Sequence, residues 1–235
     1  MAESGRVVDA FYDAADKTSD CLAEVADAVR PLLRGWLHLV MFPLVVVFGM
    51  ILIVGAQSFP GRISVIIYTA TSALLFGTSA LYHRGKWSPK AHLWLKRMDH
   101  SNIYLCIAGT YTPFAVLALE GTAQTAILVG VWAGALLGVI FRMGWPDAPR
   151  WLYTPLYVLL GWAAIFVLPE LSKGAGGTAL ALTILGGVIY TVGGIIYGLK
   201  RPNTWPQVWA FHEYFHAATV LAWLSQYAAV SVVVF

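Results

Sequence analysis

The segment from Trp36 to Ala56 reads WLHLVMFPLVVVFGMILIVGA, and it decides the class of fold. It contains one histidine and no Asp, Glu, Lys or Arg. A helix needs about 20 mostly apolar residues to cross the hydrocarbon core of a bilayer, and this segment supplies them. The chain is therefore interpreted as a membrane protein.

The composition of the whole chain agrees with this interpretation. Of its 235 residues, 59% are hydrophobic and 11% are charged, whereas soluble domains carry about 25% charged residues. Six further stretches are long and apolar enough to form membrane-spanning helices. They are roughly Ile63–His83, Met98–Leu119, Ala123–Phe141, Trp151–Leu168, Thr178–Leu199 and Val208–Val234. We therefore predict an all-α bundle of seven transmembrane helices over residues 31–235.

The first 30 residues differ from the rest because they are acidic and contain no long apolar run. Their apolar residues recur at helical spacing, so we predict an amphipathic cytoplasmic segment over residues 1–30, without a cleavable signal peptide. Across the seven predicted spans, 13 Lys and Arg residues lie on the side of the N-terminus and two on the other side. Because such an excess marks cytoplasmic loops, we predict a cytoplasmic N-terminus and an outside C-terminus.

Three histidines and one aspartate are predicted to meet at the cytoplasmic end of this bundle. His83 ends the second span, Asp99 begins the third, and His212 and His216 share one face of the seventh. Three neutral imidazoles with an open fourth position suit Zn²⁺, so we predict that these histidines hold a metal ion. Asp99 is then either a further ligand or a general base beside the metal. Ser79 lies one turn before His83 on the same helical face.

The run His212-Glu213-Tyr214-Phe215-His216 also matches the His-Glu-x-x-His signature of zinc metalloproteases. Such an enzyme needs a third ligand, and no Asp follows Glu213 in this chain. Glu213 also lies about 100° from His212 around the helix. An intramembrane metalloprotease is therefore disfavoured. Three histidines are predicted to lie outside the metal site: His38 and His92 as interfacial or hydrogen-bonded residues, and His100 because it cannot face the same ion as Asp99.

The order and spacing of these motifs resemble the hemolysin III branch of the progestin and adipoQ receptor superfamily. The motifs that carry the resemblance are Ser79-x-x-x-His83, Asp99 at the start of the third span, Arg201-Pro202-Asn203 and His212-x-x-x-His216. The resemblance covers about residues 30–235 and implies a zinc ion held by His83, His212 and His216. Asp99 would bind that zinc through a water, with Ser79 nearby.

One departure from the family pattern lies at the start of the first span. Many bacterial members carry an acidic residue there, followed by an Asn-x-x-x-His run. This chain instead reads Leu33-Arg34-Gly35-Trp36-Leu37-His38. His38 matches the family histidine, but the residues before it do not, so we predict no role for the first span in the site.

These observations lead to two hypotheses about function. In the first, the chain is a zinc-dependent hydrolase of lipid amide or ester bonds at the cytoplasmic leaflet, serving bacterial membrane homeostasis with Asp99 and Ser79 as catalytic residues. In the second, the zinc is structural and the protein is a non-catalytic lipid sensor. The resemblance implies a multi-pass protein of the bacterial inner membrane.

The partners predicted under both hypotheses are membrane lipids or fatty acyl chains. Nucleic acid is excluded, since the basic residues lie in short loops and form no patch. Gly130, Gly134 and Gly138 recur every four residues in the fourth span, a pattern typical of close helix packing. The same row suits packing within the bundle or a contact between two copies, so a homo-oligomer stays open.

Overall fold

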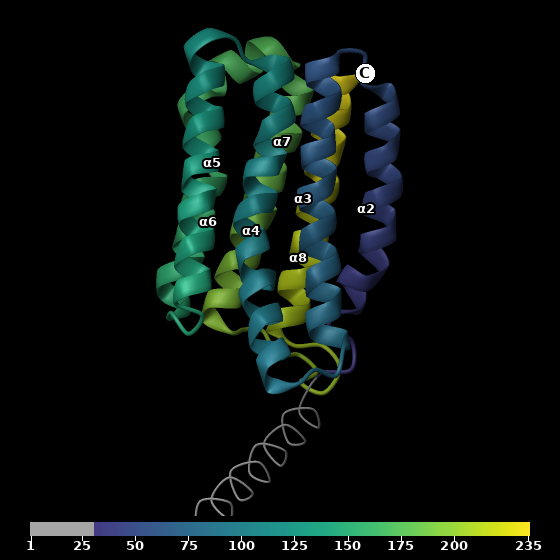
Figure 1. Ribbon diagram of the computed structural model, residues 1–235, viewed down its shortest axis with the longest axis vertical. Helices are drawn as coiled ribbons and strands as arrows, with labels where there is room; N and C mark the ends of the chain where they lie inside the picture. Colours follow the sequence, from purple (N-terminus) through teal and green to yellow (C-terminus); the bar gives the residue numbers. More distant parts are fainter. Residues whose placement is uncertain (1–30) are drawn as a thin grey trace, which may run out of the picture.

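The computed structural model describes residues 31–235, and these residues form an all-α fold (Figure 1). No strand occurs between residues 31 and 235. The helices are α2 (Trp36–Gly55), α3 (Phe59–Arg84), α4 (Pro89–Ala118), α5 (Gly121–Gly144), α6 (Arg150–Gly161), the 3₁₀ helix η1 (Ala163–Val167), α7 (Leu168–Leu199) and α8 (Phe211–Val234). The amphipathic segment predicted over residues 1–30 lies outside the described residues.

The helices stand side by side along the long axis of the molecule (Figure 1). Helix α4 lies inside the bundle and contacts α3, α5, α6, α7 and α8, while α8 packs on α7 and α2. The end of α3 and the beginnings of α2, α4 and α8 lie at the same end of the bundle, the lower end in Figure 1. This arrangement brings the predicted site residues to one level.

Five stretches of the described chain are long and apolar enough to cross a membrane. They are α2, α3, α5, α8 and the continuous stretch Arg150–Leu199, which contains both α6 and α7. Helix α4 is not among them, and polar residues such as Asn102 and Thr112 lower its hydropathy. Both side chains are buried, and Asn102 donates to the Leu74 carbonyl at 3.1 Å and to Thr78 Oγ1 at 3.0 Å. These two polar side chains of α4 therefore lie against neighbouring helices.

Several helix boundaries differ from the prediction. Helix α4 begins at Pro89, nine residues before the predicted span, because Ser88 caps it by accepting from the Ala91 N–H at 3.4 Å. The break predicted at Lys173–Gly177 falls at Gly176, whose φ of 81° and ψ of 166° are not helical, so α7 consists of two helical segments that meet at a kink. The glycine-rich run therefore interrupts the helix at the position predicted for a break.

The predicted fifth span is interrupted inside the bundle, because α6 ends at Gly161 and η1 follows. Tyr111 compensates for the backbone hydrogen bonds that this interruption removes. Its hydroxyl donates to the Gly161 carbonyl at 2.6 Å and accepts from the Ala164 N–H at 2.8 Å. Unpaired backbone groups are costly inside a membrane protein, so this single side chain makes the break tolerable.

The glycine row of α5 makes contact with neighbouring helices at two of its three positions. A Cβ at Gly138 would lie 2.5 Å from the ring of Tyr104, and one at Gly134 would lie 2.8 Å from Leu160, whereas one at Gly130 would meet nothing within 4 Å. Gly134 and Gly138 therefore allow α5 to pack closely against its neighbours within the bundle.

We expect Gly138→Val to lower the thermal unfolding midpoint of the purified protein. The added carbons would overlap Tyr104, which is 2% exposed and belongs to the main core, and such overpacking costs about 1–3 kcal/mol. Gly130→Val is the matched control, from the same row, and should unfold at the wild-type midpoint. Equal midpoints for the two variants would contradict the close α4–α5 contact.

Candidate metal centre

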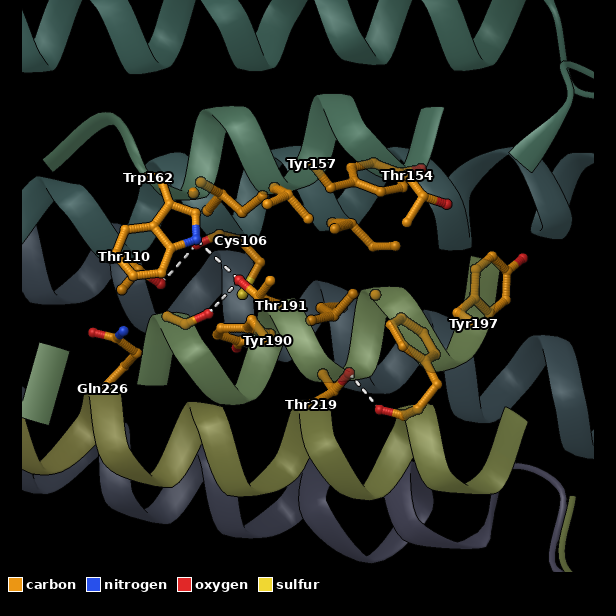
Figure 2. Close-up of a pocket in the computed structure, with 18 of the residues that line it drawn as sticks. Cys106, Thr110, Thr154, Tyr157, Trp162, Tyr190, Thr191, Tyr197, Thr219 and Gln226 are labelled. Atoms are coloured by element: carbon orange, nitrogen blue, oxygen red, sulfur yellow. Dashed lines mark hydrogen bonds between the residues drawn. The ribbon is translucent and has the colours of Figure 1, made fainter. Parts of the chain in front are cut away.

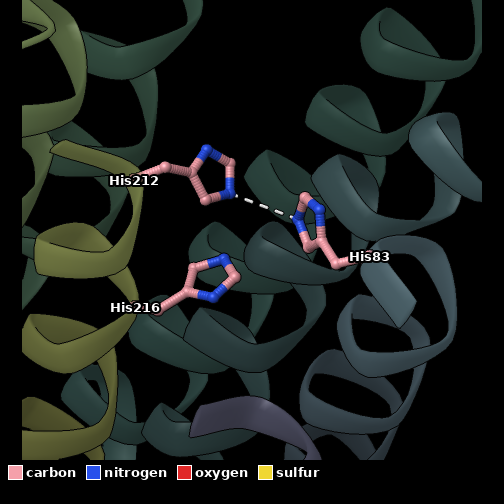
Figure 3. Close-up of side chains that lie close together, drawn as sticks. All are labelled: His83, His212 and His216. Carbon is pink, nitrogen blue, oxygen red and sulfur yellow. Dashed lines mark hydrogen bonds between the residues drawn. The ribbon is translucent and has the colours of Figure 1, made fainter. Parts of the chain in front are cut away.

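Three histidine side chains converge at one end of the bundle (Figure 3). His83 lies in the last turn of α3, and His212 and His216 lie in the first two turns of α8. One ring nitrogen from each histidine lies within 4.8 Å of the other two. His83 and His216 are buried and His212 is half-buried. The residues predicted as ligands thus lie close enough to hold a metal ion, and ligation itself stays a prediction.

The donor geometry fits a small tetrahedral ion. His212 Nε2 and His83 Nε2 lie 3.2 Å apart. Two nitrogen ligands at ~2.0–2.1 Å from a tetrahedral ion lie about 3.3 Å apart, so the observed separation is close to that of two ligands of one ion. Without an ion, one of these nitrogens must carry a proton toward the other. The donor set is three imidazole nitrogens, which suits Zn²⁺ among other transition metals.

Asp99 and Ser79 lie beside the three histidines. Asp99 Oδ2, from the third turn of α4, is 3.8 Å from His83 Nε2. Among the described residues, the ligand atoms that lie within 4.8 Å of one another come from the three histidines, and Asp99 contributes none of them. Ser79 is 1% exposed and lies within hydrogen-bonding reach of the Asp99 carboxylate. Asp99 therefore lies beside the three histidines, and its role there stays a prediction.

Glu213 faces away from the histidine cluster and is fully engaged elsewhere. One carboxylate oxygen pairs with Arg34 Nε, and the other accepts from the Ala210 N–H at 2.9 Å, which caps α8. Glu213 is 1% exposed. Both oxygens are thus paired with groups outside the histidine cluster, and the prediction against a metalloprotease stays a prediction. The sequence contained a signal for this pair, since an acidic residue in an apolar helix requires a partner.

Two further histidines lie near the cluster. His38, predicted to be interfacial or hydrogen-bonded, is 2% exposed, and its ring stacks on that of His216. His100 remains outside the ligand group, as predicted. Its Nδ1 is 2.7 Å from the Lys96 carbonyl oxygen, and its Nε2 is 3.3 Å from the Tyr197 hydroxyl.

An apolar cavity of about 150 Å³ opens next to the histidine cluster (Figure 2). Its wall at this end includes Ser79, Asp99, His212 and His216, and it continues between α4, α6, α7 and α8 as far as Gln226. Ten residues of helix separate His216 from Gln226, which corresponds to about 15 Å. The cavity therefore extends along α8 from the histidine cluster, and its lining is mostly apolar.

Two tyrosines, Tyr153 and Tyr197, line the cavity next to the cluster, and arginine side chains that sequence reasoning missed stack on their rings. Arg142 was counted as a loop residue, but it lies in α5, is 1% exposed and stacks 4.3 Å above the ring of Tyr153. The hydroxyls of Tyr153 and Tyr197 are 3.1 Å apart, and Arg150 lies 4.5 Å above the ring of Tyr197. No local pattern indicated this arrangement, because it joins α5, α6 and α7.

The fold and the site together define an all-α membrane protein with a histidine cluster that could hold a metal ion beside an apolar cavity. The sequence model of one family, described as haemolysin-III related, matches residues 26–227. The chain therefore belongs to the haemolysin-III related family.

Two curated relatives agree with this assignment. A hemolysin-3 homolog of Bacillus subtilis (strain 168) is 35% identical over 147 residues, which are 63% of this chain and 68% of that protein. The hemolysin-3 of Bacillus cereus is 34% identical over 131 residues, which are 56% of this chain and 59% of that protein. The second match thus spans less than two thirds of the relative's length.

Proposed function

We propose that this protein is a zinc-dependent hydrolase of lipid amide or ester bonds that contributes to bacterial membrane homeostasis. The observation that carries the proposal is the position of three convergent histidines, with Asp99 beside them, at the mouth of a long apolar cavity. A reactive polar end joined to an apolar tunnel matches the shape of a lipid, whose scissile bond lies next to its acyl chain.

The proposed membrane arrangement has seven crossings, formed by α2 to α8. Helix α4 would cross as an internal helix whose polar groups face its neighbours, and Arg150–Leu199 would cross twice. Between residues 31 and 235, ten of the twelve Lys and Arg residues lie toward the end of the bundle that carries the histidines. The positive-inside rule then makes this end cytoplasmic, in the inner membrane of the bacterium.

The proposed site assigns a separate task to each residue. His83, His212 and His216 would hold Zn²⁺ and leave a fourth position open. When bound, Zn²⁺ supplies a water whose pKa is lowered to about 7 and polarises a carbonyl oxygen. Asp99, whose Oδ2 lies 3.8 Å from His83 Nε2, would act as the general base of the site. Ser79 would orient the Asp99 carboxylate, and the cavity would hold the acyl chain of a lipid from the cytoplasmic leaflet.

The proposal is tested by incubating purified, zinc-loaded protein with a panel of lipid amides and esters and measuring released fatty acid by mass spectrometry. We expect Asp99→Asn to lower the rate about 10²- to 10⁴-fold, the usual contribution of a general base, while zinc content stays unchanged. If the zinc-loaded wild type releases no fatty acid from any member of the panel, the proposed hydrolase activity is wrong. Metal-dependent folding without turnover would instead support a structural zinc in a lipid sensor.

Asp147→Asn is the matched control for this experiment. Asp147 lies at the same end of the molecule, but its side chain is 77% exposed and pairs with Lys96 at 2.9 Å. The Lys96 ammonium holds the pKa of Asp147 below its ordinary value, so this carboxyl is a poor base. The control variant should keep both wild-type turnover and wild-type zinc content.

A further inference from the structure

His38 lies in the first turn of α2, at the same end of the bundle as the three clustered histidines. Gly35 brings this turn close to α3, since a Cβ at position 35 would lie 2.7 Å from the Cβ of His83. With a φ of 80°, Gly35 adopts a backbone conformation that other residues rarely take. The site is thereby closed on the side of α2, and His38 lines the same cavity as His216 and Asp99.

The ring of His38 is held between two aromatic neighbours. Its centroid lies 3.8 Å from that of His216 with an interplanar angle of 12°, which is a stacked pair. Its second contact is an edge-to-face pair with Phe76, in which the ring centroids lie 4.9 Å apart and the ring planes make an angle of 82°. Because the terminal torsion of a histidine is otherwise broad, this stack restricts the ring plane of His216.

The two ring nitrogens of His38 distinguish it from an ordinary packing residue. Both are buried, and neither makes a hydrogen bond of standard geometry within the described part of the chain. A buried polar group without a partner is costly, so phenylalanine would pack here at lower cost if the ring served stacking alone. His38 is not a member of the group of atoms that could share one ion among the described residues. Because His38 lines the cavity, a polar atom of a molecule held there would supply such a partner.

We propose that His38 is a positioning residue of the metal centre: it stacks on His216 to hold the plane of that ring, and it offers a ring nitrogen to an oxygen atom of the molecule bound in the cavity. This inference rests on the proposed function, because it presumes that His216 binds a metal ion. It adds α2, which sequence reasoning left outside the site, to the helices that build it.

The stacking role is tested by measuring zinc affinity, by competition with a chelator, for wild type, His38→Ala and His38→Phe. We expect His38→Ala to bind zinc about 10- to 100-fold more weakly, as when the support of a ligand is lost. His38→Phe keeps a stacked ring and should retain an affinity close to wild type. The visible absorption of the cobalt-loaded proteins should follow the same order, changing in His38→Ala and not in His38→Phe.

Val45→Ala is the control for loss of packing. Val45 is fully buried two turns further along α2, and it belongs to the main core. Its truncation should destabilise the fold while zinc affinity and the cobalt spectrum stay those of the wild type. Equal loss of affinity in Val45→Ala and His38→Ala would mean that α2 acts through general packing, and the positioning role would be overturned.

The hydrogen-bonding role is tested with acetohydroxamate, which presents oxygen atoms to a metal site. His38→Phe should bind this probe about tenfold more weakly than wild type, although it binds zinc normally. Equal affinity for the probe would reject the role of the nitrogen. Wild-type protein that binds no zinc at all would overturn the proposed function and this inference together. Zinc bound equally by wild type and His38→Ala would overturn this inference alone.

Discussion

His83→Ala and His216→Ala should each purify without the single zinc ion that we expect in the wild-type chain. Each substitution leaves two imidazoles, and two neutral ligands do not retain zinc against a chelator as three do. His83 belongs to α3 and His216 to α8, so the loss of zinc in both variants would establish that one ion joins these two helices. Elemental analysis of the purified proteins measures the result.

His100→Ala is the control for this first prediction. His100 lies at the same end of the bundle, but its nitrogens face Lys96 and Tyr197 rather than the cluster. This variant should keep its zinc. Adding a chelator should lower the unfolding midpoint of the wild type and of His100→Ala, because an ion that binds only the folded state stabilises it. Zinc retained in His83→Ala would break the proposed link between α3 and α8.

Arg34→Ala should cause the largest loss of stability among substitutions outside the metal ligands. It leaves the Glu213 carboxylate, which is 1% exposed, without its ion-pair partner. Removing one partner of a buried pair costs about 3–5 kcal/mol, because the remaining charge is uncompensated. The free energy of unfolding of the purified protein, measured by denaturant titration in detergent, gives the magnitude.

Lys96→Ala provides the matched comparison for the second prediction. It also removes one cation of an ion pair, but its partner Asp147 is 77% exposed and remains hydrated. Exposed pairs contribute about 0–1 kcal/mol, so this variant should unfold close to the wild type. Equal destabilisation by Lys96→Ala and Arg34→Ala would contradict the buried character of the pair between Arg34 and Glu213.

Glu213→Gln extends this experiment to the chemistry of the site. Its amide oxygen can still accept from the Ala210 N–H, and Arg34 reaches solvent because its side chain is 18% exposed. We therefore expect a smaller loss of stability than for Arg34→Ala, with lipid hydrolysis and zinc content largely retained. A zinc metalloprotease would instead lose nearly all activity, since its general base would be gone.

The sequence by itself determined the features that depend on local composition and spacing. Long apolar runs indicated an all-α membrane protein, because each helix must satisfy its own backbone groups in lipid. Four-residue spacing placed His212 and His216 on one face. Alternating helix direction and the asymmetry of basic residues then predicted that His83 and Asp99 would lie level with them. The structure brings these residues together at one end of the bundle.

The features that depend on contacts between distant segments became apparent in the assembled bundle alone. The stack of His38 on His216 joins α2 to α8, the pair of Arg34 with Glu213 spans 179 positions, and Tyr111 of α4 supports the break after Gly161. Hydropathy and periodicity describe one helix at a time, so they contain no information about which faces meet. The partner of a buried charge, ring or backbone group is set by the packing of helices, and packing emerges only when the whole bundle is assembled.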